Sequence, residues 1–221
     1  MERFTAWLLD FLMTLPVILI SLSVHELCHG YAAYRLGDPT AKAMGRLSLN
    51  PLRHIDPFGF LALMFFHVGW AKPVSVDSRY FKNPKRDMAI TALAGPLSNF
   101  LLAFVFTFVY FLLFRLGSTM GWLSSSRVTP FAVLVLMTNM MVQINLGLGV
   151  FNLVPIPPLD GSKILYAFLP YHVLYKIAPY ERYFHFVLLF LLWAGVLSVP
   201  IGFAVDLFYE LFMKLAGGII L

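Results

Sequence analysis

The sequence predicts an all-α polytopic membrane protein with about four transmembrane helices and a re-entrant or short β region between the first two. Of the 221 residues, 60% are hydrophobic and 12% are charged, a balance unlike that of soluble globular domains. The apolar residues lie in long runs, and a helix needs about 20 such residues to cross the hydrocarbon core. We therefore expect one transmembrane domain over residues 1–221, with no separate soluble module.

The charge of the chain indicates membrane topology and not nucleic-acid binding. The net charge is +5, but the basic residues lie in loops between the apolar runs, where their distribution reports orientation. We expect the lipid bilayer as a partner and no nucleic acid. The single cysteine, Cys28, excludes an intramolecular disulfide and a thiolate cluster, and we interpret it as a packing residue.

The first predicted span, residues 4–35, contains the sequence H-E-L-C-H and is stopped by Gly37-Asp-Pro39. His25 and His29 are four residues apart, so a helix places both imidazoles on one face, where they can bind one metal ion. Glu26 follows about 100° round the helix, within reach of a metal-bound water. The alternative is a structural histidine and a glutamate that reaches the membrane surface. Three ionisable groups this close favour the metal site, because each costs a few kcal/mol at depth unless it is paired or functional.

Residues 36–87 form a long loop in which we predict a re-entrant segment. With Arg35 at its edge, this loop carries nine of the sixteen Lys and Arg residues. Residues 58–71 are apolar over about 14 residues, which is too short to span and suits a re-entrant or interfacial segment. Residues 41–49 and 72–76 are short and bounded by turns, so we predict strands there.

Two further spans are predicted at residues 88–114 and from Phe131 onward. The first of them opens with A-G-P-L-S-N at 94–99, whose small residues predict a close approach of helices. The other carries many amides for a lipid-facing helix, so we expect these side chains to face protein or a water-filled site and to bond neighbouring helices. They are Asn139, Gln143, Asn145 and Asn152.

The third span must break at N-L-V-P-I-P-P-L-D-G, residues 152–161. Its three prolines remove backbone donors and disfavour helix at the residues before them. Asp160 then stands where a helix restarts. A final span is predicted at residues 183–213. Its expected bends are Gly195, Pro200 and Gly202.

The distribution of basic residues predicts the orientation of the spans. Residues 35–87 and 170–182 share one side and hold eleven Lys and Arg, whereas the other side holds four. The positive-inside rule puts the long loop in the cytoplasm, in a multi-pass protein of the cell membrane. His29 and Asp160 both approach that side, as a shared metal site requires.

A catalytic zinc site usually takes three protein ligands and a water, so one ligand must come from outside the first span. Asp160 is preferred, because a carboxylate in an apolar segment needs a partner and the proline break frees backbone to aim it inward. The alternative for Asp160 is a cap on the helix that begins at Gly161. His54 is the next choice of ligand. The remaining candidates are His67, His172, His185 and Asp56.

Three ordered motifs, H-E-L-C-H, A-G-P-L-S-N and N-L-V-P-I-P-P-L-D-G, resemble the site-2 protease family of intramembrane zinc metalloproteases. The resemblance covers about residues 21–165. G-R-L-S-L-N-P at 45–51 and G-W-A-K-P-V at 69–74 also resemble the compact members of that family. There is no room within this stretch for the PDZ insertion of larger members, so we do not expect substrate selection by such a module.

The resemblance implies one Zn²⁺ held by His25, His29 and Asp160, with Glu26 as the catalytic base. It also implies a transmembrane protein as substrate, cut in or near its membrane segment. On this hypothesis Glu26 takes a proton from a water that attacks a peptide carbonyl. A substrate helix must unwind first, and we expect residues 41–76 to offer a strand edge to the extended segment. Candidate substrate-binding or oxyanion residues are Asn152, Asn145 and His54.

Three other classes of protein remain as alternatives at this point. A membrane metal or ion transporter would use the same His, Glu and Asp residues as a passage site, and metal flux without peptide cleavage would identify it. A di-iron membrane oxidase needs more paired histidines than the single H-x-x-x-H of this chain supplies. An inactive scaffold that binds membrane proteins would fail to retain zinc.

Overall fold

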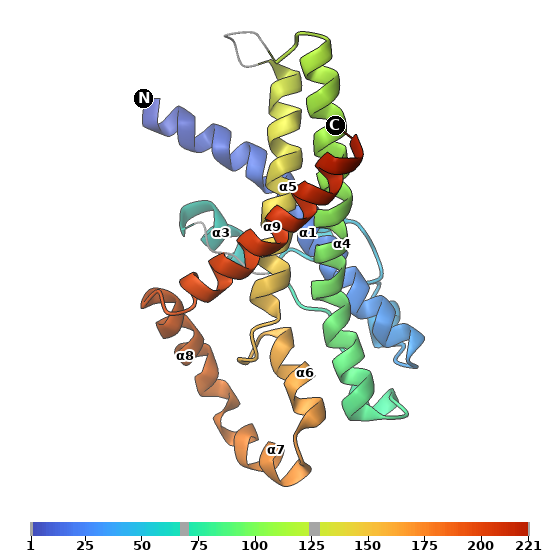
Figure 1. Cartoon of the computed structure of the whole chain (residues 1–221). Helices are drawn as coiled ribbons and strands as arrows, with labels where there is room; N and C mark the ends of the chain where they lie inside the picture. Colours follow the sequence, from blue (N-terminus) through green and yellow to red (C-terminus); the bar gives the residue numbers. More distant parts are fainter. Residues whose placement is uncertain (1, 67–70, 124–128, 221) are drawn as a thin grey trace.

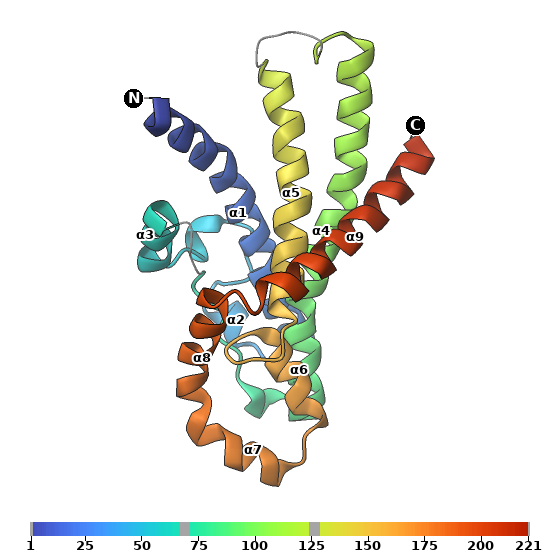
Figure 2. The same ribbon diagram turned by 60° about the vertical axis from the view of Figure 1, so that its left-hand side comes forward.

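The computed structural model describes residues 2–66, 71–123 and 129–220, and in these residues the chain is helical and has no strand (Figure 1, Figure 2). The predicted all-α class is confirmed. The longer helices are α1 (Glu2–Arg35), α4 (Pro84–Thr119), α5 (Pro130–Asn152), α8 (Glu181–Trp193) and α9 (Ser198–Ile220). The shorter elements are α2 (Thr40–Ala43), α3 (Pro57–Phe66), α6 (Asp160–Phe168) and α7 (Tyr171–Ile177), with the 3₁₀ turns η1 (Pro51–Arg53), η2 (Ser78–Tyr80) and η3 (Ala178–Tyr180).

Three helices in the described part of the chain are long and apolar enough to cross a membrane. They are α1, in which Trp7–Arg35 qualifies, α4 and α5. Their surfaces carry exposed leucines such as Leu97, Leu101 and Leu112, because lipid tails are as apolar as the side chains that face them. The described part of the chain thus has three candidate spans, or four if the bent pair of apolar stretches at 171–193 and 198–220 forms one, in keeping with the predicted membrane protein.

The final span predicted at residues 183–213 consists of two helices. α8 ends before Gly195, whose φ is +71°. The N–H groups of Gly195 and Val196 bond carbonyls of the last turn, a helix ending that glycine favours because it has no Cβ. The apolar helices on the two sides of this break are bent by 75°. The other two expected bends, Pro200 and Gly202, lie inside α9.

α4 is the central helix and contacts α1, α5, α6 and α9. Figure 1 shows α4 and α5 side by side, with α9 crossing both. The core between these three helices is built on Ala103, Val142 and Leu146, each 0% exposed. Aromatic side chains of α4 and α9 pack against it, namely Phe100, Phe106, Phe208, Tyr209 and Phe212.

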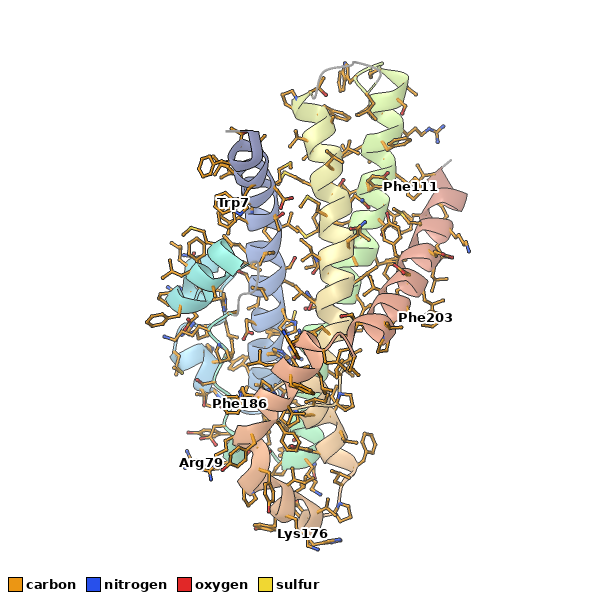
Figure 3. The ribbon with its side chains drawn as sticks, turned by 90° about the vertical axis from the view of Figure 1, so that its left-hand side faces the viewer. Trp7, Arg79, Phe111, Lys176, Phe186 and Phe203 are labelled. Carbon is orange, nitrogen blue, oxygen red and sulfur yellow. The ribbon has the colours of Figure 1, made fainter. Side chains whose placement is uncertain are left out.

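The two basic segments of the chain lie toward the same end of the molecule. Figure 3 shows Arg79 of the long loop and Lys176 of α7 toward one end, and Trp7 and Phe111 toward the other. The end of α4 and the start of α5 lie at the end of the molecule opposite α7 (Figure 1). This arrangement agrees with the grouping of the two basic segments on one side of the spans.

A buried aspartate organises the start of the long loop, where residues 41–49 were expected to form a strand. The Asp38 carboxylate, 0% exposed, accepts hydrogen bonds from the N–H groups of Thr40 (2.9 Å) and Asp77 (2.7 Å). It thereby begins the helical turn α2 and ties that turn to the residues before η2. The strand predicted at 41–49 is wrong, because residues 41–43 are helical and residues 44–49 form a turn and an irregular segment. Farther out, hydrogen bonds from the Arg79 side chain hold the pKa of the Asp77 carboxyl below its usual range.

In its described residues, the rest of the long loop contains the helix α3, the 3₁₀ turns η1 and η2, and an isolated bridge. The predicted re-entrant segment, residues 58–71, contains α3, which has ten residues, and its residues 67–70 lie outside the described part. The strand predicted at 72–76 is absent, since Pro73 has no N–H to donate to a ladder. What pairing there is consists of an antiparallel bridge between Ile55 and Ala71.

Candidate metal centre

Two histidines of α1 place their Nε2 atoms close together. His25 and His29 are buried, at 5% and 8% exposure, and their Nε2 atoms lie 2.9 Å apart. The Nδ1 atom of His29 lies 2.7 Å from the Thr91 carbonyl oxygen. A carbonyl oxygen can only accept, so His29 carries its proton on Nδ1 and has a lone pair on Nε2. His25 Nδ1 lies 2.6 Å from Asn99 Oδ1.

Asp160, at the start of α6, completes a group of three. Its Oδ2 atom lies 3.2 Å from His25 Nε2 and 3.0 Å from His29 Nε2. The other carboxylate oxygen, Oδ1, lies 3.4 Å from Lys163 Nζ. The next residue must be glycine, because a Cβ on Gly161 would lie 2.6 Å from the Val154 carbonyl oxygen and closer still to Leu153 O. We call His25, His29 and Asp160 the histidine–aspartate cluster.

The histidine–aspartate cluster fits a zinc ion by its donor atoms and its size. Two imidazole nitrogens and a carboxylate oxygen are a ligand set of catalytic zinc sites. Tetrahedral zinc with bonds of about 2.0–2.1 Å to nitrogen and oxygen places its ligand atoms about 3.3–3.4 Å apart. The distances in the cluster are 2.9 to 3.2 Å, so a small outward movement accommodates the ion. Acceptors brought this close need a proton or a metal cation between them.

Gly95 of α4 leaves the space in front of the two imidazoles free. A Cβ at this position would lie 2.6 Å from His25 Cε1 and closer still to His29 Nε2. The backbone of α4 therefore forms the wall of the cluster, and no larger residue fits. This confirms the prediction that the small residues at 94–99 allow a close approach of helices.

Glu26 lies beside the cluster on α1 and is 8% exposed. Its Oε2 atom accepts a 2.8 Å hydrogen bond from the N–H of Val74. The long loop also packs on α1 next to it, since a Cβ on Gly30 would lie 3.3 Å from Val74 Cγ1 and 2.8 Å from Leu47 Cδ2. One carboxylate oxygen of Glu26 is thus held by the loop.

The other three predicted site residues have their side chains engaged elsewhere. Asn152 Nδ2 donates to Leu148 O of its own helix at 3.0 Å. Asn145 is 0% exposed and bonds two neighbouring helices. His54 is 2% exposed, with Nε2 2.7 Å from Ser48 O within the long loop. Only His25, His29 and Asp160, with Glu26 beside them, are brought together among the predicted residues that the structure describes.

The remaining candidates for the third ligand lie away from the cluster. His172 and His185 are exposed on α7 and α8. Asp56 Oδ1 accepts from the N–H of Phe58 at 3.0 Å and so begins α3. His67 lies outside the described residues.

The amides predicted to join helices do so at two positions. Asn139 Oδ1 accepts a 2.9 Å hydrogen bond from Tyr209 OH on α9, and Asn145 Nδ2 donates to Ser21 Oγ on α1 at 2.8 Å. Gln143, in contrast, is exposed on the surface of α5.

Sequence reasoning missed four residues that support the cluster. Asn99 and Thr91 accept at the two Nδ1 atoms, Val74 donates to Glu26, and Lys163 contacts Asp160. Asn99 had a signal, because it is a polar residue in an apolar span one turn from Gly95. Lys163 also had one, since it stands three residues after Asp160 on a helix. Thr91 and Val74 act through backbone groups, which carry no signal in side-chain chemistry.

Comparisons with known proteins were consistent with one another. The profile of Peptidase family M50 matches residues 13–195. YwhC of Bacillus subtilis is 40% identical over 86% of this chain and 85% of its own length. MJ0611 of Methanocaldococcus jannaschii is 33% identical over 72% and 71%, and Rip2 of Mycobacterium tuberculosis is 30% identical over 82% and 66%. The names of all three contain the words zinc metalloprotease. No solved structure matches the chain significantly.

Proposed function

Because the chain belongs to Peptidase family M50 and is an intramembrane zinc metalloprotease, we propose that the histidine–aspartate cluster holds the zinc ion and that Glu26 is the catalytic base. The observation that carries this assignment is the convergence of two imidazole nitrogens and a carboxylate oxygen within 4.8 Å of one another. They come from two helices, α1 and α6, and Asp160 follows His29 by 131 residues in the sequence. Buried ionisable groups in a membrane protein mark functional sites by default.

The chain's own residues divide the work of hydrolysis between them. When bound, zinc polarises a peptide carbonyl and lowers the pKa of a water. Glu26 takes the proton of the attacking water through the carboxylate oxygen that Val74 leaves free, and it returns that proton to the leaving nitrogen. The Val74 N–H holds the Glu26 side chain in place between turns of the cycle. Lys163 balances the charge of Asp160 on the side away from the histidines.

We propose a transmembrane protein as substrate, cut in or near its membrane segment. A membrane helix has its carbonyls bonded internally, so the segment that is cut must first become extended. Residues 72–76 lie beside Glu26 and pair with no strand of the described chain. The N–H groups of Lys72 and Val74 are bonded to His54 O and Glu26 Oε2, so such a segment would pair with the carbonyl groups of residues 72–76.

We propose the cell membrane as the location, with the site nearer the cytoplasmic side and the bent α8–α9 pair as a fourth crossing. The support is the excess of basic residues in the long loop and in residues 170–182. Single cysteines at Tyr175 and Lys214, introduced in a Cys28→Ser background, test both statements in intact cells. A membrane-impermeant thiol reagent added outside labels position 214 and not 175. Labelling of both positions from outside contradicts the orientation.

The assigned roles are tested by separating metal binding from hydrolysis. The purified Glu26→Gln variant retains zinc and loses cleavage of single-span substrates, because its side chain fills the same space and cannot take a proton. The Asp160→Ala variant loses zinc as well as cleavage. A Glu26→Gln variant that cleaves at the parent's rate with zinc bound would falsify the assigned base. Neither the described residues nor the comparisons support a metal transporter.

A further inference from the structure

A row of buried hydrogen bonds connects His25 to the backbone of α5. His25 Nδ1 lies 2.6 Å from Asn99 Oδ1, and Asn99 Nδ2 lies 2.8 Å from Asn145 Oδ1. Asn145 Nδ2 in turn lies 2.8 Å from both Met141 O and Ser21 Oγ. Asn99, Asn145 and Ser21 are each 0% exposed, so these bonds are shielded from bulk solvent. We call Asn99 and Asn145 the amide relay.

The far end of the amide relay sets the direction of every bond in it. Met141 O is a backbone carbonyl, which can only accept, and the Ser21 hydroxyl donates its own proton to Val17 O at 2.7 Å. Asn145 must therefore turn its NH₂ group toward both, which leaves its oxygen facing Asn99. Asn99 must then present its NH₂ group to Asn145 and its oxygen to His25. A reversed amide at either position would put two donors or two acceptors face to face.

We infer that the amide relay fixes the tautomer of His25, so that its proton stays on Nδ1 and its lone pair stays on Nε2, facing Asp160. The inference rests on the proposed zinc site and adds a function for Asn99 and Asn145. Asn99 is a positioning residue that acts through His25, and Asn145 acts through Asn99. The partner of the non-ligating nitrogen decides which nitrogen of a histidine binds metal.

The two histidines of the cluster thus reach the same tautomer in different ways. His29 Nδ1 has the Thr91 carbonyl as its partner, and a carbonyl cannot be reversed. His25 has an amide as its partner, and an amide can rotate by 180° and offer a donor where an acceptor was. A second amide with its own fixed partners removes that freedom. Asn145, on α5, is needed for this reason.

A simpler role for the same amides is to bind α1, α4 and α5 together, which buried amides do in membrane proteins. The two roles differ in what they predict for zinc. If the amides only join helices, any substitution that weakens helix packing lowers zinc affinity in proportion to the lost stability. If they orient His25, zinc affinity depends on whether position 99 offers an acceptor, whatever the change in stability.

The experiment measures zinc affinity of the purified full chain by competition with a chelator, together with thermal unfolding and kcat. The variants are Asn99→Leu, which removes the acceptor, and Asn99→Asp, which keeps an acceptor for Nδ1–H but gives up the donor to Asn145. Asn145→Leu frees the Asn99 amide to rotate, and Asn99→Leu/Asn145→Leu combines the two. The matched control is Thr107→Val on α4, which removes a 0% exposed hydroxyl that bonds Ala103 O of its own helix.

The amide relay predicts a distinct order of zinc affinities. Asn99→Leu binds zinc about 10- to 100-fold more weakly than the parent, the usual effect of losing the partner of a ligating histidine. Asn99→Asp stays within about threefold of the parent, and Asn145→Leu lies between them. The double variant binds no more weakly than Asn99→Leu, because Asn145 acts only through Asn99. Thr107→Val matches the parent in affinity and kcat.

Several outcomes overturn the relay and are distinct from failure of the proposed function. Equal losses of affinity in Asn99→Leu and Asn99→Asp show a packing role, as does an additive double variant. If Asn99→Leu does not fold, parent-like affinity in Asn145→Leu overturns the relay by itself. A parent chain that binds no zinc contradicts the proposed zinc site instead.

Discussion

The backbone N–H of Val74 donates a hydrogen bond of 2.8 Å to Oε2 of Glu26, which precedes it by 48 residues. The long loop therefore reaches back to the carboxylate that we propose as the base. A bond from a donor to an ionised acceptor contributes about 1.5–3 kcal/mol when its partner is buried. A change in the position of the loop therefore changes the orientation of the Glu26 carboxylate.

Val74→Pro removes this donor and tests the coupling. We expect kcat to fall about tenfold or more, because the loss of about 1.5–3 kcal/mol of interaction leaves Glu26 free to turn away. Zinc content stays at the level of the parent, since Val74 does not contact the histidine–aspartate cluster. Steady-state cleavage of a single-span substrate and metal analysis measure the two quantities. Val74→Ala is the control, because it keeps the N–H and should keep the activity.

Gly95→Ala places a methyl group against the imidazoles of His25 and His29. The added Cβ would overlap ring atoms of both, so we expect zinc content well below one ion per chain and loss of cleavage. Metal analysis of the purified, folded variant tests this. The control is Gly147→Ala on α5, where a Cβ meets nothing within 4 Å. Full zinc content in Gly95→Ala would show that the backbone of α4 does not form a wall of the site.

Asp38→Asn weakens the start of the long loop. The amide keeps one acceptor where the carboxylate used two oxygens for Thr40 and Asp77, so one partly buried donor loses its partner, at a cost of at most about 1–3 kcal/mol. We expect faster proteolysis within residues 38–83 and a lower kcat with unchanged zinc content. Limited proteolysis followed by mass analysis maps the cuts. Asp206→Asn, at an exposed carboxylate of α9, should behave like the parent.

Gly195→Ala strains the break between α8 and α9. A residue with a Cβ at φ +71° costs roughly 1–2 kcal/mol, although open space surrounds the position. We expect a lower Tm in detergent with no change in zinc affinity, because the proposed ligands are on α1 and α6 and not on the helices that meet at this break. Gly202→Ala provides the comparison, since Gly202 lies within α9 and has no positive φ. Equal Tm values for the two variants would contradict this account.

Much of the fold and site could be predicted from the sequence because the decisive signals are local. The long apolar runs predicted α1, α4 and α5, and the prolines after Asn152 predicted the restart at Asp160. The spacing of His25 and His29 indicated a shared metal, and Asp160 was preferred because a carboxylate in apolar surroundings needs a partner. The structure brings these three side chains together, which the roles proposed for them require.

What could not be predicted depends on partners that sequence spacing does not reveal. A short apolar or turn-bounded segment does not show whether it will pair, and a buried Asp38 turned residues 40–43 into a helix. The role of Asn99 depends on Asn145 in another helix, so neither side chain alone indicates it. The break at Gly195 was expected as a bend within one span, because a glycine's φ cannot be read from its neighbours.

The side chains of the histidine–aspartate cluster come from two helices that both pack against α4. Two of the proposed ligands are on α1 and one is on α6, and both helices pack against α4. A bound ion would therefore link α1 to α6. Any motion that separates either helix from α4 would weaken its binding. Substrate must therefore reach Glu26 without separating α1 or α6 from α4. The rate of zinc release during turnover measures how far these helices separate.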